Sequence, residues 1–186
     1  MNSFRLNHKL PLLLALAACL TCACGKSEQQ TAFSNQATKI DAWVTAQLAA
    51  HEDYRAVYHD GTIKIVLVEG DGEPLRKGGR LTMDYSGYDF SNASMSASTL
   101  FVTTMSEVAS AARWSLSDES IFTPVTITLG DDDIVTGLAL GLEGITAGEE
   151  CYIIFTGEYG FGKKPNGTIP ANAALCYHVF AREVAN

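Results

Sequence analysis

The fold class is set by the stretch from Thr123 to Thr156, which is TPVTITLGDDDIVTGLALGLEGITAGEECYIIFT. Residues 123–129 and 150–156 are short runs rich in apolar and β-branched side chains, which predicts two strands. Residues 134–145 between them are apolar and rich in leucine, which predicts one short helix. Antiparallel strands around a single central helix indicate an α+β domain.

Further strands are predicted on both sides of this stretch. Residues 62–68 and 80–88 come before it and residues 174–184 after it, each as a strand-like run next to turn-forming residues. Residues 106–112 have the composition of a helix. The strands therefore outnumber the helices, as in an antiparallel sheet with few helices.

Residues 35–50 predict a helix with one apolar side, and Ser34 can cap its first turn. Such an apolar stripe must pack against another surface. Two interpretations stay open: the helix packs on the main domain, or it forms a dimerisation arm. The stripe consists of Ile40, Trp43, Val44 and Leu48.

The first residues have the layout of an export signal. Arg5 and Lys9 give a positively charged start, and the apolar run 10–18 ends in small residues. Even if this run is extended to Cys24, it is too short to cross a bilayer as a helix.

Cys19 is the predicted site of lipidation. Leu16-Ala17-Ala18-Cys19 is similar to the bacterial lipobox, in which the cysteine becomes the lipidated first residue, and Cys24 is a weaker second candidate. We therefore expect a lipoprotein signal peptide at 1–18, and a lipid anchor followed by a polar tether at 19–33.

The cysteines predict neither a metal site nor a disulfide. Cys19, Cys22 and Cys24 are close together, but nothing in the sequence supplies a second cluster of ligands. Cys151 and Cys176 fall in two predicted strands, where the alternation of side chains places their thiols on opposite sides of the sheet.

Composition limits the class of protein. The chain has 186 residues, of which 47% are hydrophobic and 18% charged, enough apolar content for a folded core and too much for a disordered chain. The formal net charge of −8 disfavours a nucleic-acid partner.

The sequence has no obvious motif for nucleophilic or metal chemistry. It lacks G-x-S-x-G and H-E-x-x-H, and its histidines are scattered. Asp131-Asp132-Asp133 lacks the spacing of a calcium loop and predicts a solvated turn. The loops instead carry apolar and aromatic side chains. This pattern favours binding, or a reaction that needs no acid, base, metal or cofactor.

Six motifs between residues 61 and 184 follow one another in a recognisable order. They are Asp84-Tyr85-Ser86-Gly87, Thr99-Leu100-Phe101, Thr128-Leu129-Gly130 with 133–138, the turn from 141–142 to 148–149, Tyr159-Gly160-Phe161-Gly162, and 169–177 with its Ile-Pro start. In these motifs the chain resembles the macrolide-binding (FKBP-type) peptidyl-prolyl cis-trans isomerases.

This resemblance implies an architecture. Residues 61–186 are expected to form an FKBP-like domain, an antiparallel sheet of about five to six strands curved around one short helix. A helical extension at 34–60 is expected to precede it, and a partly helical insert at 102–124 to decorate it.

The resemblance also implies an apolar substrate pocket. Val102, Leu138 and Phe161 depart from the family pattern, which has an aspartate, a tryptophan and a tyrosine there. The implied catalytic residues are Tyr85, Phe101, Ile134, Val135, Phe161 and Tyr177, and the implied substrate-binding residues are Val125, Ile127, Leu138 and Ile169.

The implied function is a prolyl isomerase that assists folding of exported proteins, lipid-anchored at the cell envelope on the periplasmic side of the outer membrane. Its expected partners are proline-containing unfolded or exported polypeptides. The three departures favour an alternative: a weak or inactive module of the same fold that binds peptides as a chaperone.

Overall fold

The computed structural model describes residues 10–116, 119–130 and 134–186, with side chains from Glu28 onward. The aspartate turn predicted at 131–133 lies outside the described residues. The chain divides into two compact units, Met1–Asn35 and Gln36–Asn186, and the second unit contains every described strand.

Helix α1 runs from Leu10 to Ala50 and so begins earlier than predicted. Residues 25–32, within the polar tether expected from the sequence, have a helical backbone. This segment contains Lys, Glu, Gln and Ala, which are good helix formers, and no proline interrupts it. No helix in the described part of the chain is both long and apolar enough to span a bilayer.

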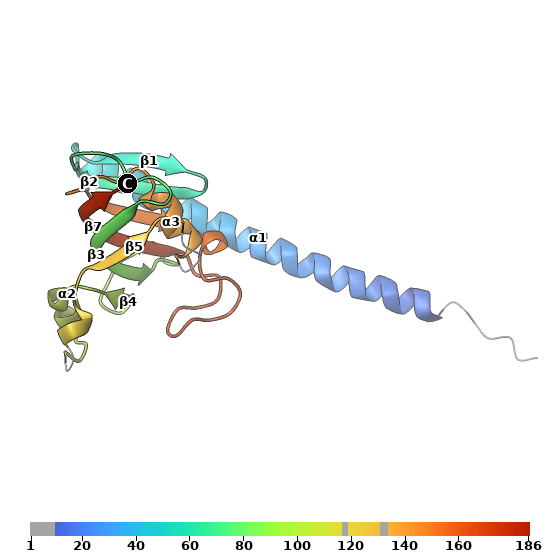
Figure 1. Ribbon diagram of the computed structural model, residues 1–186. Coiled ribbons are helices and arrows are strands. Elements are labelled where there is room, and N and C mark those ends of the chain that lie inside the picture. The colour runs from blue at the N-terminus through green and yellow to red at the C-terminus, as the bar shows by residue number, and fades with distance from the viewer. Residues whose placement is uncertain (1–9, 117–118, 131–133) are drawn as a thin grey trace, which may run out of the picture. The chain divides into compact units, whose positions relative to one another are not determined.

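Seven strands of the described residues form one antiparallel sheet in the order β1-β2-β6-β7-β3-β4, with β5 also paired to β3 (Figure 1). The α+β class is confirmed, but the sheet has β1 and β4 in addition to the strands predicted. β1 lies inside the predicted helical extension at 34–60. The strands are β1 (Arg55–His59), β2 (Thr62–Val68), β3 (Arg80–Asp89), β4 (Leu100–Thr103), β5 (Val125–Thr128), β6 (Glu150–Phe155) and β7 (Leu175–Ala185).

Strand β3 organises the sheet, because it pairs with β7 along one side and with β4 and β5 along the other. Tyr85 lies opposite Val179 on β7, and Gly87 lies opposite Tyr177. Since side chains alternate along a strand, Tyr85, Gly87 and Tyr177 all face the same side of the sheet.

Helix α3 (Thr136–Leu142) packs against this same side, where Leu138 and Leu142 join the larger hydrophobic core. The insert between β4 and β5 contains helix α2 (Ser106–Ala111), which the sequence predicted at 106–112, and the 3-10 turn η1 (Glu119–Ile121), which it did not. A second 3-10 turn, η2 (Gly157–Tyr159), follows β6.

The opposite side of the sheet carries a second core. Ile40 and Val44, from the part of α1 that belongs to the second unit, pack there with Ile63, Phe90 and Ile154. The prediction that this helix packs on the main domain is therefore confirmed. A role in dimerisation remains a prediction.

The two strand cysteines are separated by the sheet. Cys151 belongs to the core on the α3 side and Cys176 to the core on the α1 side. Both are free thiols, as expected from the alternation of side chains. Burial raises the pKa of both thiols, so both stay protonated at neutral pH.

Gly137 lets α3 lie directly on the sheet. A Cβ atom built at this position would stand 2.2 Å from Cγ of Phe155 on β6. We expect Gly137→Ala to lower the free energy of unfolding by about 1–3 kcal/mol, because the cost of overpacking exceeds the gain of up to about 1 kcal/mol in helix propensity. Chemical denaturation measures this change.

Thr136→Ala is the matched control, since Thr136 begins the same helix and is exposed. Its free energy of unfolding should stay within about 0.5 kcal/mol of the parent. Equal stability of the Gly137→Ala protein and the parent would contradict the close packing of α3.

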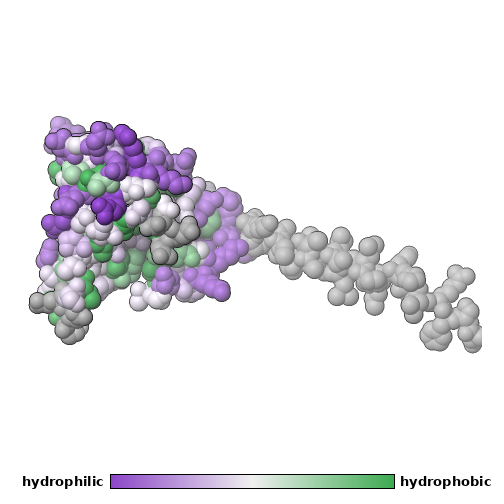
Figure 2. Space-filling model, in the orientation of Figure 1, coloured by the Kyte–Doolittle hydropathy of each residue, from purple (hydrophilic) through white to green (hydrophobic). Residues whose placement is uncertain are grey.

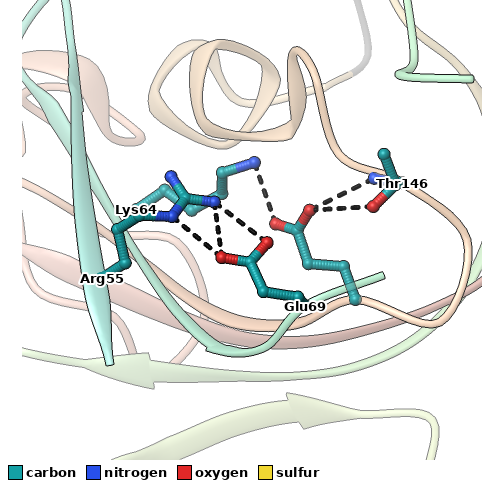
Figure 3. Close-up of polar contacts among 5 residues, drawn as sticks. Arg55, Lys64, Glu69 and Thr146 are labelled. Carbon is teal, nitrogen blue, oxygen red and sulfur yellow. Dashed lines mark hydrogen bonds and ion pairs between the residues drawn. The ribbon is translucent and has the colours of Figure 1, made fainter. Parts of the chain in front are cut away.

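A buried ion pair joins a residue of β2 to the residue just before β6. Lys64 Nζ lies 2.9 Å from Glu149 Oε1, with side chains 8% and 4% exposed, and this oxygen has no other partner among the described residues (Figure 3). The other oxygen, Oε2, accepts hydrogen bonds from the backbone N–H and hydroxyl of Thr146. The pair therefore ties β2 to the turn that precedes β6.

Candidate functional site

A cavity of about 460 Å³ opens on the α3 side of the sheet, and every residue predicted for the site lines it. The sequence did not identify Met83, Asn166, Gly167 or Thr168, which also line it. The structure thus brings the predicted residues together, whereas their roles stay predictions. The predicted lining residues are Tyr85, Phe101, Val125, Ile127, Ile134, Val135, Leu138, Phe161, Ile169 and Tyr177.

The cavity is mainly apolar and is built from most parts of the domain. β3, β4, β5 and β7 supply its walls, residues 134–138 at the start of α3 supply one end, and residues 161–169 supply a loop. In the space-filling view, hydrophobic surface lies across the middle and lower part of the domain, whereas the upper part around β1 and β2 is mostly hydrophilic (Figure 2).

Aromatic rings form a connected group around Tyr177. The centroid of the Phe101 ring lies 5.8 Å from that of Tyr177 and 6.3 Å from that of Phe161, with interplanar angles of 87° and 80°. The Tyr85 ring lies 6.1 Å from Tyr177, and the Phe155 ring stacks on Tyr177 at 6.0 Å. These edge-to-face and stacked contacts fix the wall of the cavity.

Gly87 explains how Phe101 reaches the cavity. A Cβ atom on Gly87 would stand 2.7 Å from Cζ of Phe101 and 2.8 Å from Cγ1 of Val102. Only glycine therefore leaves room for the Phe101 ring to lie over β3. The glycine in the Asp84–Gly87 motif thus has a direct steric role.

The backbone of Tyr85 is held by Thr104, which sequence reasoning missed. The Tyr85 N–H donates to Thr104 Oγ1 at 3.0 Å, and the Thr104 N–H donates back to the Tyr85 carbonyl at 3.0 Å. The Thr104 hydroxyl in turn donates to the buried carboxylate of Asp84, which is paired with Arg182. This network lies just after β4, in a segment whose residues show no periodic pattern.

The loop beside the cavity is closed by a tight turn. Asn166 and Ile169 exchange two backbone hydrogen bonds of 3.0 Å each, and Gly167 between them has a φ of 59°. The turn directs Ile169 inward, where it is only 5% exposed. Phe161, earlier in the same loop, is 40% exposed and lies at the cavity edge.

Among the described residues, no Asp, Glu, His, Lys or Arg side chain lines the cavity. Tyr85 and Tyr177 are the only titratable groups among its described lining residues, and burial raises the pKa of both phenols. His178 faces the other side of the sheet, where its Nε2 lies 2.8 Å from Glu150 Oε1. The described residues contain no group of three or more His, Cys, Asp or Glu side chains placed to hold a metal ion.

Such a cavity binds an apolar group and shields it from water, with recognition left to a few polar atoms at its border. These properties suit an apolar ring or side chain as the bound group.

The family is established by comparison with known proteins. The model of the FKBP-type peptidyl-prolyl cis-trans isomerase family matches residues 72–181, which is more than half of the chain. The chain therefore belongs to this family.

Two curated fungal proteins are similar to part of the chain. FK506-binding protein 1 of Aspergillus oryzae is 32% identical over 56 residues, which covers 30% of this chain and 48% of that protein. FK506-binding protein 1B of Aspergillus fumigatus is 35% identical over 57 residues, with the same shares covered. The chain spans about half the length of these relatives.

Solved structures support the fold alone. The N-terminal domain of FKBP42 from Arabidopsis thaliana has a TM-score of 0.56 and 22% identity, and covers 72% of this chain and 94% of that chain. FkpA from Escherichia coli has a TM-score of 0.56 and 16% identity, and covers 99% of this chain and 75% of that chain.

Proposed function

We propose that this chain catalyses cis-trans isomerisation of peptide bonds that precede proline. The observation that carries the proposal is that all the predicted residues line one apolar cavity, in a chain of the FKBP-type family. Its aromatic wall suits a proline ring, which is apolar and has no N–H.

The proposed mechanism needs no proton transfer. Rotation about a peptide bond has a barrier of about 18–20 kcal/mol, and bonds that precede proline cross it unaided in tens to hundreds of seconds. The amide loses conjugation and polarity as it twists. A dry apolar cavity therefore stabilises the twisted form relative to the planar one, and each 1.4 kcal/mol of this difference gives about a tenfold acceleration.

The departures at Val102, Leu138 and Phe161 are expected to lower the rate without abolishing it. All three side chains line the cavity and keep it apolar. A phenylalanine in place of the family's tyrosine removes one hydrogen bond, worth about 0.5–1.5 kcal/mol, or up to about tenfold in rate.

The second candidate is a catalytically weak or inactive module of the same fold that binds peptides, and the same three departures favour it. In that case the cavity would hold proline-containing segments without accelerating their isomerisation.

We further propose that the protein acts at the cell envelope, held by a lipid on Cys19 at the periplasmic side of the outer membrane. Its substrates would then be exported chains that fold near this membrane. The sequence supports this location through the layout of residues 1–19. The mass of the mature protein tests it, since cleavage before Cys19 plus acyl chains gives a defined value.

The experiment for the proposed activity follows a peptide that contains Leu-Pro by NMR exchange or by a coupled spectroscopic assay. We expect the purified protein to shorten the relaxation time of the cis isomer in proportion to its concentration. If the relaxation time is unchanged but the peptide binds measurably, the protein is the inactive peptide-binding module and not an isomerase. If the protein neither accelerates isomerisation nor binds the peptide, both candidates are refuted.

A further inference from the structure

Tyr177 places a polar atom in an otherwise hydrophobic part of the cavity. Its side chain is 3% exposed, and its ring packs between Phe101 and Phe155. Its hydroxyl makes no hydrogen bond with any described residue. The oxygen is nevertheless not fully enclosed by protein, so it borders the open space of the cavity.

The ring contacts do not require this hydroxyl. A phenylalanine on β7 would stack on Phe155 and meet the edge of Phe101 in the same way. Because this hydroxyl has no protein partner in the described part of the chain and borders the cavity, only water in the cavity can pair with it in the free protein. A buried polar group of this kind therefore indicates a partner supplied from outside the chain.

The hydroxyl is a donor at physiological pH. Burial, and to a smaller extent the neighbouring Tyr85, raises the pKa of Tyr177. The phenol is therefore neutral and carries its proton at neutral pH.

The chemistry of a proline-containing segment limits what this donor can meet. The carbon atoms of the proline ring are apolar, and the ring nitrogen carries no hydrogen to donate. The backbone of such a segment can still accept hydrogen bonds, because its carbonyl oxygens have free lone pairs.

We infer that the Tyr177 hydroxyl donates a hydrogen bond to a backbone carbonyl of the bound prolyl peptide. This inference rests on the proposed function, since it requires that a prolyl peptide occupies the cavity. Tyr177 is then the binding residue that supplies polar recognition from β7, whereas Phe161 at the cavity edge supplies only shape. An interaction made equally in the ground and transition states affects affinity rather than turnover.

Tyr177→Phe removes only the hydroxyl group of this side chain. We expect the mutant to bind an Ala-Leu-Pro-Phe peptide about 3- to 10-fold more weakly than the parent in an NMR titration of the full chain. We also expect KM to rise with little change in kcat. The thermal midpoint of the free protein should be equal to that of the parent or higher, because the hydroxyl has no internal partner to lose.

Tyr152→Phe is the matched control. Tyr152 lies on β6 and faces the opposite side of the sheet, and burial raises its pKa to about 12. Tyr152→Phe removes a phenolic hydroxyl from a partly buried ring outside the cavity, so peptide affinity should not change.

The outcomes separate this inference from the proposed function. If the parent binds the peptide and Tyr177→Phe binds it equally well, the inference is wrong and the proposed function stands. If Tyr177→Phe lowers the thermal midpoint by several degrees, the hydroxyl has a structural role and the inference is also wrong. If the parent itself neither binds nor isomerises the peptide, both fail together.

Discussion

Replacing Glu149 by alanine is expected to lower the free energy of unfolding by about 3–5 kcal/mol. Lys64 would remain buried with no carboxylate beside it, and Thr146 would lose the acceptor of its N–H and hydroxyl. A buried charge without a partner is much more costly than a missing surface contact. Urea denaturation monitored by circular dichroism measures the change.

The neighbouring pair offers the control, because Arg55 and Glu69 form a bidentate ion pair at the surface (Figure 3). Their side chains are 53% and 62% exposed. Glu69→Ala should therefore change stability by no more than about 1 kcal/mol. Similar effects of Glu149→Ala and Glu69→Ala would show that burial does not decide the strength of these pairs.

A double substitution tests the cause. Lys64→Met combined with Glu149→Leu removes both charges together, and should recover much of the stability that Glu149→Ala loses. A double variant as unstable as the single one would mean that the Thr146 hydrogen bonds, rather than the unpaired charge, dominate the loss.

Phe101→Ala is expected to lower kcat/KM for a Leu-Pro peptide by about 30-fold or more, which corresponds to about 2 kcal/mol. The Phe101 ring contacts both Tyr177 and Phe161, so its removal opens one wall of the cavity to water. The rate of isomerisation and the affinity for the peptide should fall together, as measured by the NMR assay and titration.

Two further variants keep this prediction decisive. Phe101→Leu retains apolar volume and should fold even if the alanine variant does not, with an intermediate rate. Phe180→Ala removes an aromatic ring from the other side of the sheet, where Phe180 contacts His178, and should leave the rate unchanged. Equal rates for Phe101→Ala and the parent would exclude the cavity as the site of catalysis.

Most of the sheet could be predicted from local sequence. Residues 80–88 begin with alternating polar and apolar side chains, residues 150–156 are a short run rich in apolar side chains, and the strands found there end within one residue of the prediction. β1 was missed because Arg55–His59 is half polar and is a strand only through its pairing with β2. Pairing of this kind is a tertiary effect that local propensity does not encode.

The site was predicted through motifs and not through periodicity. Phe101 and Ile169 fall in segments with no regular pattern, and only their place among the family's motifs connected them. Met83 had a local signal, since it lies two residues before Tyr85 on the same face of β3. Thr104 had none, because its role depends on hydrogen bonds to a distant part of the chain.

Strand β7 follows all the others along the chain, yet it lies between β6 and β3. Until residues 175–185 have been synthesised, the two halves of the sheet have no strand to join them, and β6 and β3 each expose an unsatisfied edge. During synthesis from the N-terminus, the nascent chain therefore cannot form the complete sheet until its last strand has been made. Maturation should be slow, dominated by contacts of long sequence separation, and vulnerable to aggregation before closure.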